Sequence, residues 1–176
     1  MDRRKMKVAV LGLVSILVIE AFLLCSVPQA GAETLKARSV VVATKYETIP
    51  VNDEPGHILS MQILEGLALL DNGEIAKRKA YAVSDIVPGK GGQGIVYNTF
   101  IFQDGSTIVV RTQRLMVADK SGAYSAKVTG EIIKGTGRFE GIKGTASGTG
   151  ITYLPSEGEA SKVLTDTTLT YTLSGK

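Results

Sequence analysis

The stretch that decides the fold is GEIIKGTGRFEGIKGTASGTG, residues 130–150. It holds seven glycines in 21 residues, interleaved with apolar residues such as Ile132, Phe139 and Ile142. A helix interior loses up to about 1 kcal/mol for each glycine in place of alanine, and a flexible linker would not carry these apolar side chains. The stretch therefore predicts two β-strands that meet at a tight turn, with glycines where the backbone bends or where two backbones approach closely.

Further strand signals lie on both sides of this stretch. Asn72-Gly73 and Asp104-Gly105 are typical of the turn in a β-hairpin. A helix is the alternative for residues 57–70, which are rich in good helix formers, but the hairpin turn that follows them favours a strand. We predict eight strands, at residues 39–46, 57–70, 74–87, 94–102, 106–115, 123–133, 138–153 and 165–173.

Consecutive antiparallel strands without a helix favour a closed barrel, because closure leaves no unpaired sheet edge. Glycines inside the long seventh strand suit the sharp coiling that a barrel requires. A two-sheet sandwich is the alternative architecture. We predict an all-β fold with one domain at residues 33–176, a single eight-stranded antiparallel β-barrel.

Residues 1–32 are predicted to be a cleavable signal peptide. A basic start is followed by an apolar run at residues 8–19, and the small residues Ala30 and Ala32 fit a cleavage site. Cleavage after Ala32 implies export, and the mature domain would be secreted or periplasmic.

Two alternatives remain for this leader. Residues 8–27 would serve as a membrane anchor if uncleaved, although Glu20 would then cost roughly 2.5–3.5 kcal/mol within the hydrocarbon. A lipoprotein modified at Cys25 is the other, but Leu24 stands where a small residue is wanted.

The mature chain is almost neutral. The precursor has 20 basic and 17 acidic residues, and the leader takes four basic and two acidic residues with it, which leaves 16 against 15. Nucleic acid is not an expected partner, because phosphate binding needs a concentrated basic face. The only cysteine, Cys25, lies in the leader and His57 is the only histidine, so we predict no disulfide, no metal site and no cofactor, and expect His57 to be a loop-edge residue.

The glycine-rich stretch also resembles a known family. Its segment GTGRFEG, residues 135–141 and followed by Gly144, resembles the Gly-x-Gly-x-Phe-x-Gly segment of the allene oxide cyclase and dirigent superfamily. Tyr46-Glu47, followed by Pro55, resembles the opening of allene oxide cyclases, and residues 170–173 have a similar strand pattern. The chain is thus identified as an exported, bacterial-type member, which implies an eight-stranded barrel with an apolar cavity at one mouth, often assembled as a trimer.

The resemblance also implies a candidate catalytic residue. A pocket glutamate in the opening segment of the plant cyclases is implicated in catalysis, and Glu47 is the matching position, with Pro55 as a candidate ligand contact. Ile49 stands where those cyclases have an asparagine that positions a water. The resemblance therefore supports the fold more than a reaction.

Four further candidate ligand-binding residues interrupt otherwise apolar strand faces: Glu65, Tyr81, Asn98 and Arg111. In a barrel such side chains are predicted to point inward and line a small-ligand cavity, where burial requires mutual pairing. A desolvated carboxylate there would have a raised pKa and would act as a general acid or base. Solvated positions on the outer face are the alternative.

Three functions remain open. We expect an exported barrel that binds a small hydrophobic ligand without catalysis. The alternative is an allene-oxide-cyclase-like or dirigent-like isomerase or cyclase that steers a reactive hydrophobic intermediate, and a third is a structural or surface interaction module. Expected partners are a small apolar molecule and copies of the same chain, with membrane contact only through an uncleaved signal. Phosphate-binding loops are excluded, because Gly130-x4-Gly135 is followed by Thr136 instead of lysine.

Overall fold

The computed structural model describes residues 31–120, 122–153 and 160–174. The signal peptide prediction falls almost wholly on residues 1–30, outside the described residues. Residues 32–176 form one unit of the chain. Within the described ranges, no helix is long and apolar enough to span a membrane.

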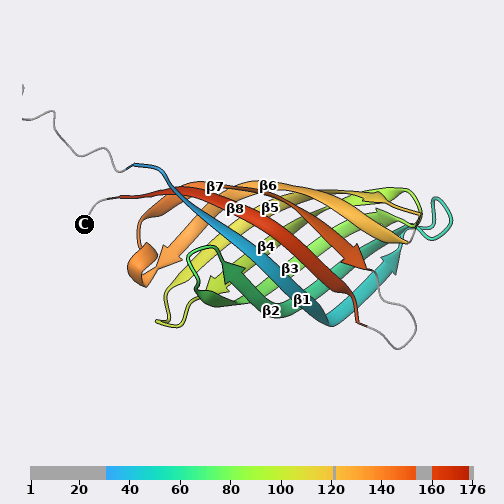
Figure 1. Ribbon diagram of the computed structural model, residues 1–176. Helices are drawn as coiled ribbons and strands as arrows, with labels where there is room; N and C mark the ends of the chain where they lie inside the picture. Colours follow the sequence, from blue (N-terminus) through green and yellow to red (C-terminus); the bar gives the residue numbers. More distant parts are fainter. Residues whose placement is uncertain (1–30, 121, 154–159, 175–176) are drawn as a thin grey trace, which may run out of the picture. The chain divides into compact units, whose positions relative to one another are not determined.

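The described residues form a closed antiparallel barrel in which each strand pairs with its neighbours in the sequence and β1 also pairs with β8 (Figure 1). The predicted eight-stranded barrel is thus confirmed, and the sandwich alternative is wrong. The strands are β1 (Glu33–Pro50), β2 (Ile58–Leu70), β3 (Ile75–Val87), β4 (Gly91–Ile101), β5 (Thr107–Ala118), β6 (Ala123–Thr136), β7 (Ile142–Tyr153) and β8 (Lys162–Leu173).

Strand β1 differs most from its predicted extent. It runs from Glu33 to Pro50, well beyond the predicted 39–46. Residues 33–42 pair with β8, and residues 37–50 pair with β2. β1 therefore pairs along both of its edges, and its pairing with β8 closes the barrel. The predicted loop before β2 is correspondingly shorter.

The interior holds both small and large side chains, and many bulky apolar side chains lie outside. In β2 the residues Gln62, Leu64 and Ala68 are buried, whereas the alternating Met61 and Leu67 are exposed. An eight-stranded barrel encloses a space only just wide enough for side chains to fill it. Small residues such as Ala76, Ala80 and Ala82 occupy most inward positions of β3, whereas β5 turns larger residues such as Ile108 and Met116 inward.

The barrel has two ends of different character. We call the end where β1 finishes and β2 begins the histidine end, after His57, and the opposite end the aromatic end, after Phe102, Phe139 and Tyr171. At the aromatic end the rings of Phe102 and Phe139 lie 4.8 Å apart, and Phe139 meets Tyr171 edge-on at 6.4 Å. These rings belong to a buried apolar cluster that fills this end.

The glycine-rich stretch forms the β6–β7 turn at the aromatic end. A short 3-10 helix, Gly137–Phe139, joins the two strands, and Gly137 adopts a positive φ of 61°. A side chain at Gly144 would place its Cβ 2.1 Å from the carbonyl oxygen of Thr170 on β8. The predicted glycine roles, a turn and a close backbone approach, are both confirmed.

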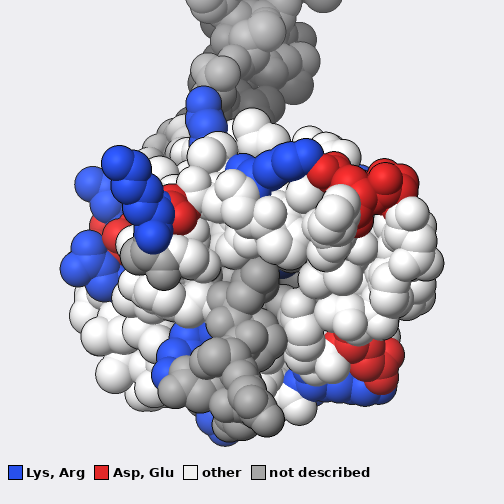
Figure 2. All heavy atoms as spheres, turned by 90° about the vertical axis from the view of Figure 1, so that its right-hand side faces the viewer, with Lys and Arg blue, Asp and Glu red and all other residues white. Residues whose placement is uncertain are grey.

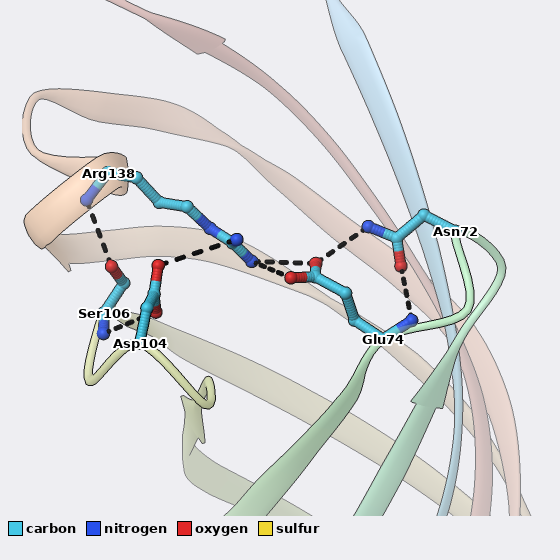
Figure 3. A network of polar contacts seen from close by, with 5 residues as sticks. All are labelled: Asn72, Glu74, Asp104, Ser106 and Arg138. Carbon is cyan, nitrogen blue, oxygen red and sulfur yellow. Dashed lines mark hydrogen bonds and ion pairs between the residues drawn. The ribbon is translucent and has the colours of Figure 1, made fainter.

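Arg138 ties three turns together at this end (Figure 3). Its Nη2 lies 2.7 Å from each carboxylate oxygen of Glu74, and its Nη1 lies 3.6 Å from Asp104. Its backbone N–H donates to Ser106 Oγ, while the guanidinium covers the rings of Phe102 and Phe139 at 4.7 and 4.8 Å. Cation–π contacts and a charge-assisted hydrogen-bonded pair thus close the aromatic end.

Candidate ligand-binding site inside the barrel

A polar layer crosses the middle of the barrel, centred on Arg78 of β3. The Arg78 side chain is only 7% exposed. It donates hydrogen bonds from Nε and Nη2 to Asn98 Oδ1 at 3.2 and 2.6 Å, and from Nη1 to Thr165 Oγ1 at 2.5 Å. Asn98 in turn donates to Thr112 Oγ1 at 3.2 Å. The layer therefore links β8, β3, β4 and β5 through side chains that all face inward.

A second buried arginine, Arg114 of β5, lies nearer the histidine end. It is 6% exposed, and its Nη2 donates to Ser84 Oγ at 2.6 Å. Ser84, Gly94 and Arg114 are successive cross-strand partners on β3, β4 and β5. A Cβ at Gly94 would lie 2.6 Å from Ser84 Oγ and 3.2 Å from Arg114 Nε, so the glycine leaves the room that the guanidinium occupies.

Neither guanidinium has a carboxylate partner among the described residues. The ion pairs found there do not include Arg78 or Arg114, and the buried polar side chains include no Asp or Glu. Burial lowers the pKa of each arginine to about 10, and repulsion from Arg114 contributes to the lowering at Arg78. Both remain cationic at neutral pH. A buried charge without a counter-charge is costly, so two of them beside one cavity are unusual for a purely structural core.

Other buried polar atoms inside the barrel also have no hydrogen-bond partner among residues 31–120, 122–153 and 160–174. They are Arg114 Nε, both amide atoms of Gln62, Ser60 Oγ and Ser39 Oγ. Gln62 is 1% exposed, and Ser60 is the cross-strand partner of Ser84. Buried polar groups in folded proteins are nearly always hydrogen-bonded, by water or a ligand where the protein supplies no partner. The inner face of β1, β2 and β5 therefore presents unused donors and acceptors.

An internal cavity adjoins both arginines. Its volume is about 30 Å³, and its wall combines Arg78, Asn98 and Arg114 with apolar residues such as Leu64, Val96 and Val110. That volume holds roughly two water molecules, far below the ~300–1,000 Å³ of a pocket for a drug-sized ligand. The expected roomy apolar cavity is therefore replaced by a small cavity with a cationic side.

Tyr46 faces the same interior because of a bulge in β1. The register with β2 shifts between Ala43 and Lys45, which inserts one extra residue and reverses the inward and outward alternation beyond it. Tyr46 therefore pairs with Gln62 of the inner face. Burial raises the pKa of Tyr46, Tyr124 also raises it, and the positive charge of Arg114 opposes the rise.

The same bulge turns Glu47 outward. Glu47 pairs in register with the exposed Met61, and its carboxylate lies 2.8 Å from Lys45 Nζ with about half of the side chain exposed. The expected position near a cavity mouth is therefore wrong. A catalytic role for Glu47 stays a prediction that the interior geometry does not support.

Three of the four strand-face candidates also point outward. Glu65 forms an ion pair with Lys79 at 2.9 Å, and Arg111 lies 3.7 Å from Glu131. Tyr81 is about half exposed. Their predicted inward orientation is wrong, because the bulky apolar residues that share their faces form the outside of the barrel.

The remaining two candidates differ from each other. Asn98 is 4% exposed within the polar layer, so its predicted inward orientation is confirmed, while contact with a ligand stays a prediction. Pro55 is exposed in the loop between β1 and β2. The structure thus brings only Asn98 of the predicted set to the cavity.

Sequence reasoning missed the residues that define the site. Arg78, Ala80, Ala82 and Ser84 alternate along β3 and all face inward. An alternation of small residues was the available signal, because only small side chains suit most interior positions of a narrow barrel. Arg78 stands in that series as the single large cation.

His57 fastens the loop at the histidine end. Its Nδ1 lies 2.5 Å from Asp53 Oδ1 and its Nε2 lies 2.6 Å from Asp85 Oδ1, which joins the β1–β2 loop to β3. Hydrogen bonds to Asp85 and Asp53 raise the pKa of His57. Lys90 pairs with Glu54 of the same loop. Figure 2 shows this end with charged side chains gathered toward its edge and uncharged ones nearer its centre.

The described residues contain no group of three or more His, Cys, Asp or Glu side chains placed to hold a metal ion.

Comparison with known proteins gives similarities at the level of fold. No known family model matches the chain, and no curated protein matches it. The structure of the pterocarpan synthase dirigent protein GePTS1 is similar with a TM-score of 0.46 and 14% identity, over 83% of this chain and 91% of that one. The pterocarpan synthase dirigent protein PsPTS1 has a TM-score of 0.43 and 12% identity, over 84% and 98%. These similarities concern the barrel fold alone.

Proposed function

We propose that this protein is a binding barrel that takes a small molecule with an apolar body into its interior, without chemistry of its own. The observation that carries the proposal is the set of buried polar atoms inside the barrel that have no partner among the described residues. Arg114 Nε belongs to the wall of the internal cavity, and both amide atoms of Gln62 lie on the inner face of β2. A solid structural core would satisfy such atoms or replace them with apolar groups. Export is part of the proposal and rests on residues 1–32 alone.

The volume of the cavity limits the size of the ligand. A molecule larger than about two waters must displace side chains toward the histidine end, where Met116, Tyr124 and Ile86 pack together. Met116 is unbranched and adapts readily to a changed shape. The ligand is therefore small, and its entry rearranges this cluster.

Binding is favoured over catalysis by what the interior holds. The buried polar set in the described residues has arginines, amides and hydroxyls, and it lacks a carboxylate or an imidazole. Those are the usual general acids and bases. The cyclase-like or dirigent-like alternative would have to rely on Tyr46 and the arginines for electrostatic steering.

The test is uptake of small molecules by the mature domain, followed through the methyl NMR signals of Val96 and Val110. Straight-chain alcohols and carboxylates from ethanol and acetate upward should shift these signals in a saturable manner. Ala126→Leu, which fills the cavity wall, should abolish the shifts. Ser125→Leu places the same side chain outside and should leave them intact. Absence of saturable shifts with every compound would leave the structural or interaction module as the better function.

A further inference from the structure

The buried charge inside the barrel is entirely positive in the described residues. Arg78 and Arg114 both line the internal cavity, the charge of Arg114 contributes to the lowered pKa of Arg78, and the neighbouring polar side chains are neutral. The carboxylates of the described residues lie on the outer faces, in loops and at the barrel ends, as in the pairs with Lys45, Lys79 and Arg138. An anion inside would offset the desolvation of both arginines.

Two N–H donors inside the barrel have no acceptor in the part of the chain that the structure describes. They are Arg114 Nε and Gln62 Nε2. Arg114 is held on its other side by the hydrogen bond to Ser84, with Gly94 leaving space beside Nε. Gln62 extends from β2, next to Tyr46 in register. The arrangement presents fixed donors from separate strands, a preorganised form that favours binding.

We propose that the interior site takes a monoanionic carboxylate, which Arg114 binds with the support of Gln62 and Arg78, as the polar head of the small molecule inferred above. The inference rests on the proposed function. A planar guanidinium matches a carboxylate in shape, and charge-assisted hydrogen bonds of this type are about twice as strong as neutral ones.

Cavity size and lining distinguish the carboxylate from other anions. A volume of about 30 Å³ accommodates a group with two oxygens, whereas a tetrahedral phosphate dianion needs more room and more donors. The rest of the wall includes Val41, Leu64 and Val110, which suit the hydrocarbon attached to a carboxylate. Inorganic phosphate has no such part.

The experiment compares charged and neutral molecules of the same shape. Butyrate and butanamide are titrated into the mature domain near neutral pH by calorimetry, with the methyl NMR signals of Val96 and Val110 as the local reporter. Butyrate should bind roughly tenfold or more tightly than butanamide, the effect of one charge-assisted contact. Inorganic phosphate should leave the interior signals unchanged.

Substitutions then test whether Arg114 is the residue that binds the carboxylate. Arg114→Gln should weaken butyrate binding roughly tenfold or more and leave butanamide binding nearly unchanged. Arg111→Gln, on the outer face of the same strand, is the matched control and should change neither. Arg114→Lys keeps the charge without the planar fork and should restore part of the affinity.

The outcomes separate this inference from the proposed function. Equal binding of butyrate and butanamide, or an unaltered butyrate affinity in folded Arg114→Gln, overturns the carboxylate head while uptake of small molecules stands. Failure of every compound to shift the interior methyl signals overturns both. Should Arg114→Gln fail to fold, the wild-type comparison of butyrate with butanamide decides alone.

Discussion

The two ends of the barrel are closed by different chemistry. At the aromatic end, rings fill the interior and Arg138 lies over them, with its charge balanced by Glu74 and Asp104. At the histidine end, a loop is fastened from outside by His57 between two aspartates, while Arg114 is buried without a counter-charge in the described residues. Arg138 is thus partly exposed and forms ion pairs, whereas Arg114 is buried and forms no ion pair with a described residue.

This difference shows which half of the molecule is built for stability. The aromatic end satisfies its charges within itself and packs its rings, as a structural closure should. The half toward the histidine end leaves buried donors unused. Such exceptions in an otherwise consistent fold are where function is expected.

The largest effect should come from the aromatic end. Phe139→Ala removes the ring that joins Phe102 to Tyr171 and should lower the free energy of unfolding by about 3–5 kcal/mol, measured by denaturant unfolding. Tyr153→Ala, an exposed aromatic on β7 at the histidine end, is the control. A similar loss in both variants would contradict the view that the aromatic end is the stabilising closure.

A smaller effect is expected for the charges at that end. Arg138→Met keeps much of the apolar stem but loses the pair with Glu74, and should cost about 1 kcal/mol, because both side chains are more than a third exposed. The Arg138 guanidinium holds the pKa of Glu74 below its usual value. The stabilisation that this pair adds to the folded state is therefore present above the unfolded pKa of Glu74, and it is lost as the pH falls through the folded pKa of Glu74. The difference in the free energy of unfolding between the wild type and Arg138→Met should shrink in acid. A difference that stays the same would argue against the pair with Glu74.

The smallest effect, and the most pH-dependent, belongs to His57. Its folded pKa is raised by Asp85 and Asp53, so its contribution is complete below the unfolded pKa of about 6.5 and is lost as pH rises through the folded pKa. His57→Gln should therefore resemble the wild type more closely at high pH than at low pH, as seen in thermal unfolding at a series of pH values.

Arg38→Gln, which breaks the exposed pair with Asp166, is the control for this series and should show no such dependence near neutral pH. An imidazole NMR titration of His57 reports its pKa directly. A midpoint at or below that of a free histidine would contradict the contact with two carboxylates.

Local sequence was sufficient for the number and order of the strands and for most turns, but not for the full extent of β1 or the start of β7. Asn72-Gly73 and Asp104-Gly105 form turns, with Gly73 and Gly105 at positive φ, and the glycine-rich stretch turns at Gly137. Each depends on backbone preferences that one residue type satisfies. The order of eight such strands then left closure as the natural solution to the edge problem.

The sequence did not predict which face of each strand points into the barrel. Alternation shows which residues share a face, as it did for Met61 and Glu65, but not which face is inside. The usual assumption that bulky apolar faces point inward fails in a narrow barrel, where Gln62 and Ala68 are inside instead. The site of Arg78 and Arg114 was missed for this reason.

The bulge in β1 has a consequence for how this wall can change. Because it adds one residue, the chemistry of the interior wall near the histidine end depends on chain length as well as on residue identity. Removing Thr44 would only straighten the strand, because Tyr46 would still lie opposite Gln62. Removing Lys45 with the bulge kept would instead move each later residue back by one position along β2. Glu47 would then replace Tyr46 opposite Gln62 and set a carboxylate inside the barrel that holds Arg114. A single deletion would thus convert a binding site for an anion into a charge-balanced core, without a substitution at any wall position.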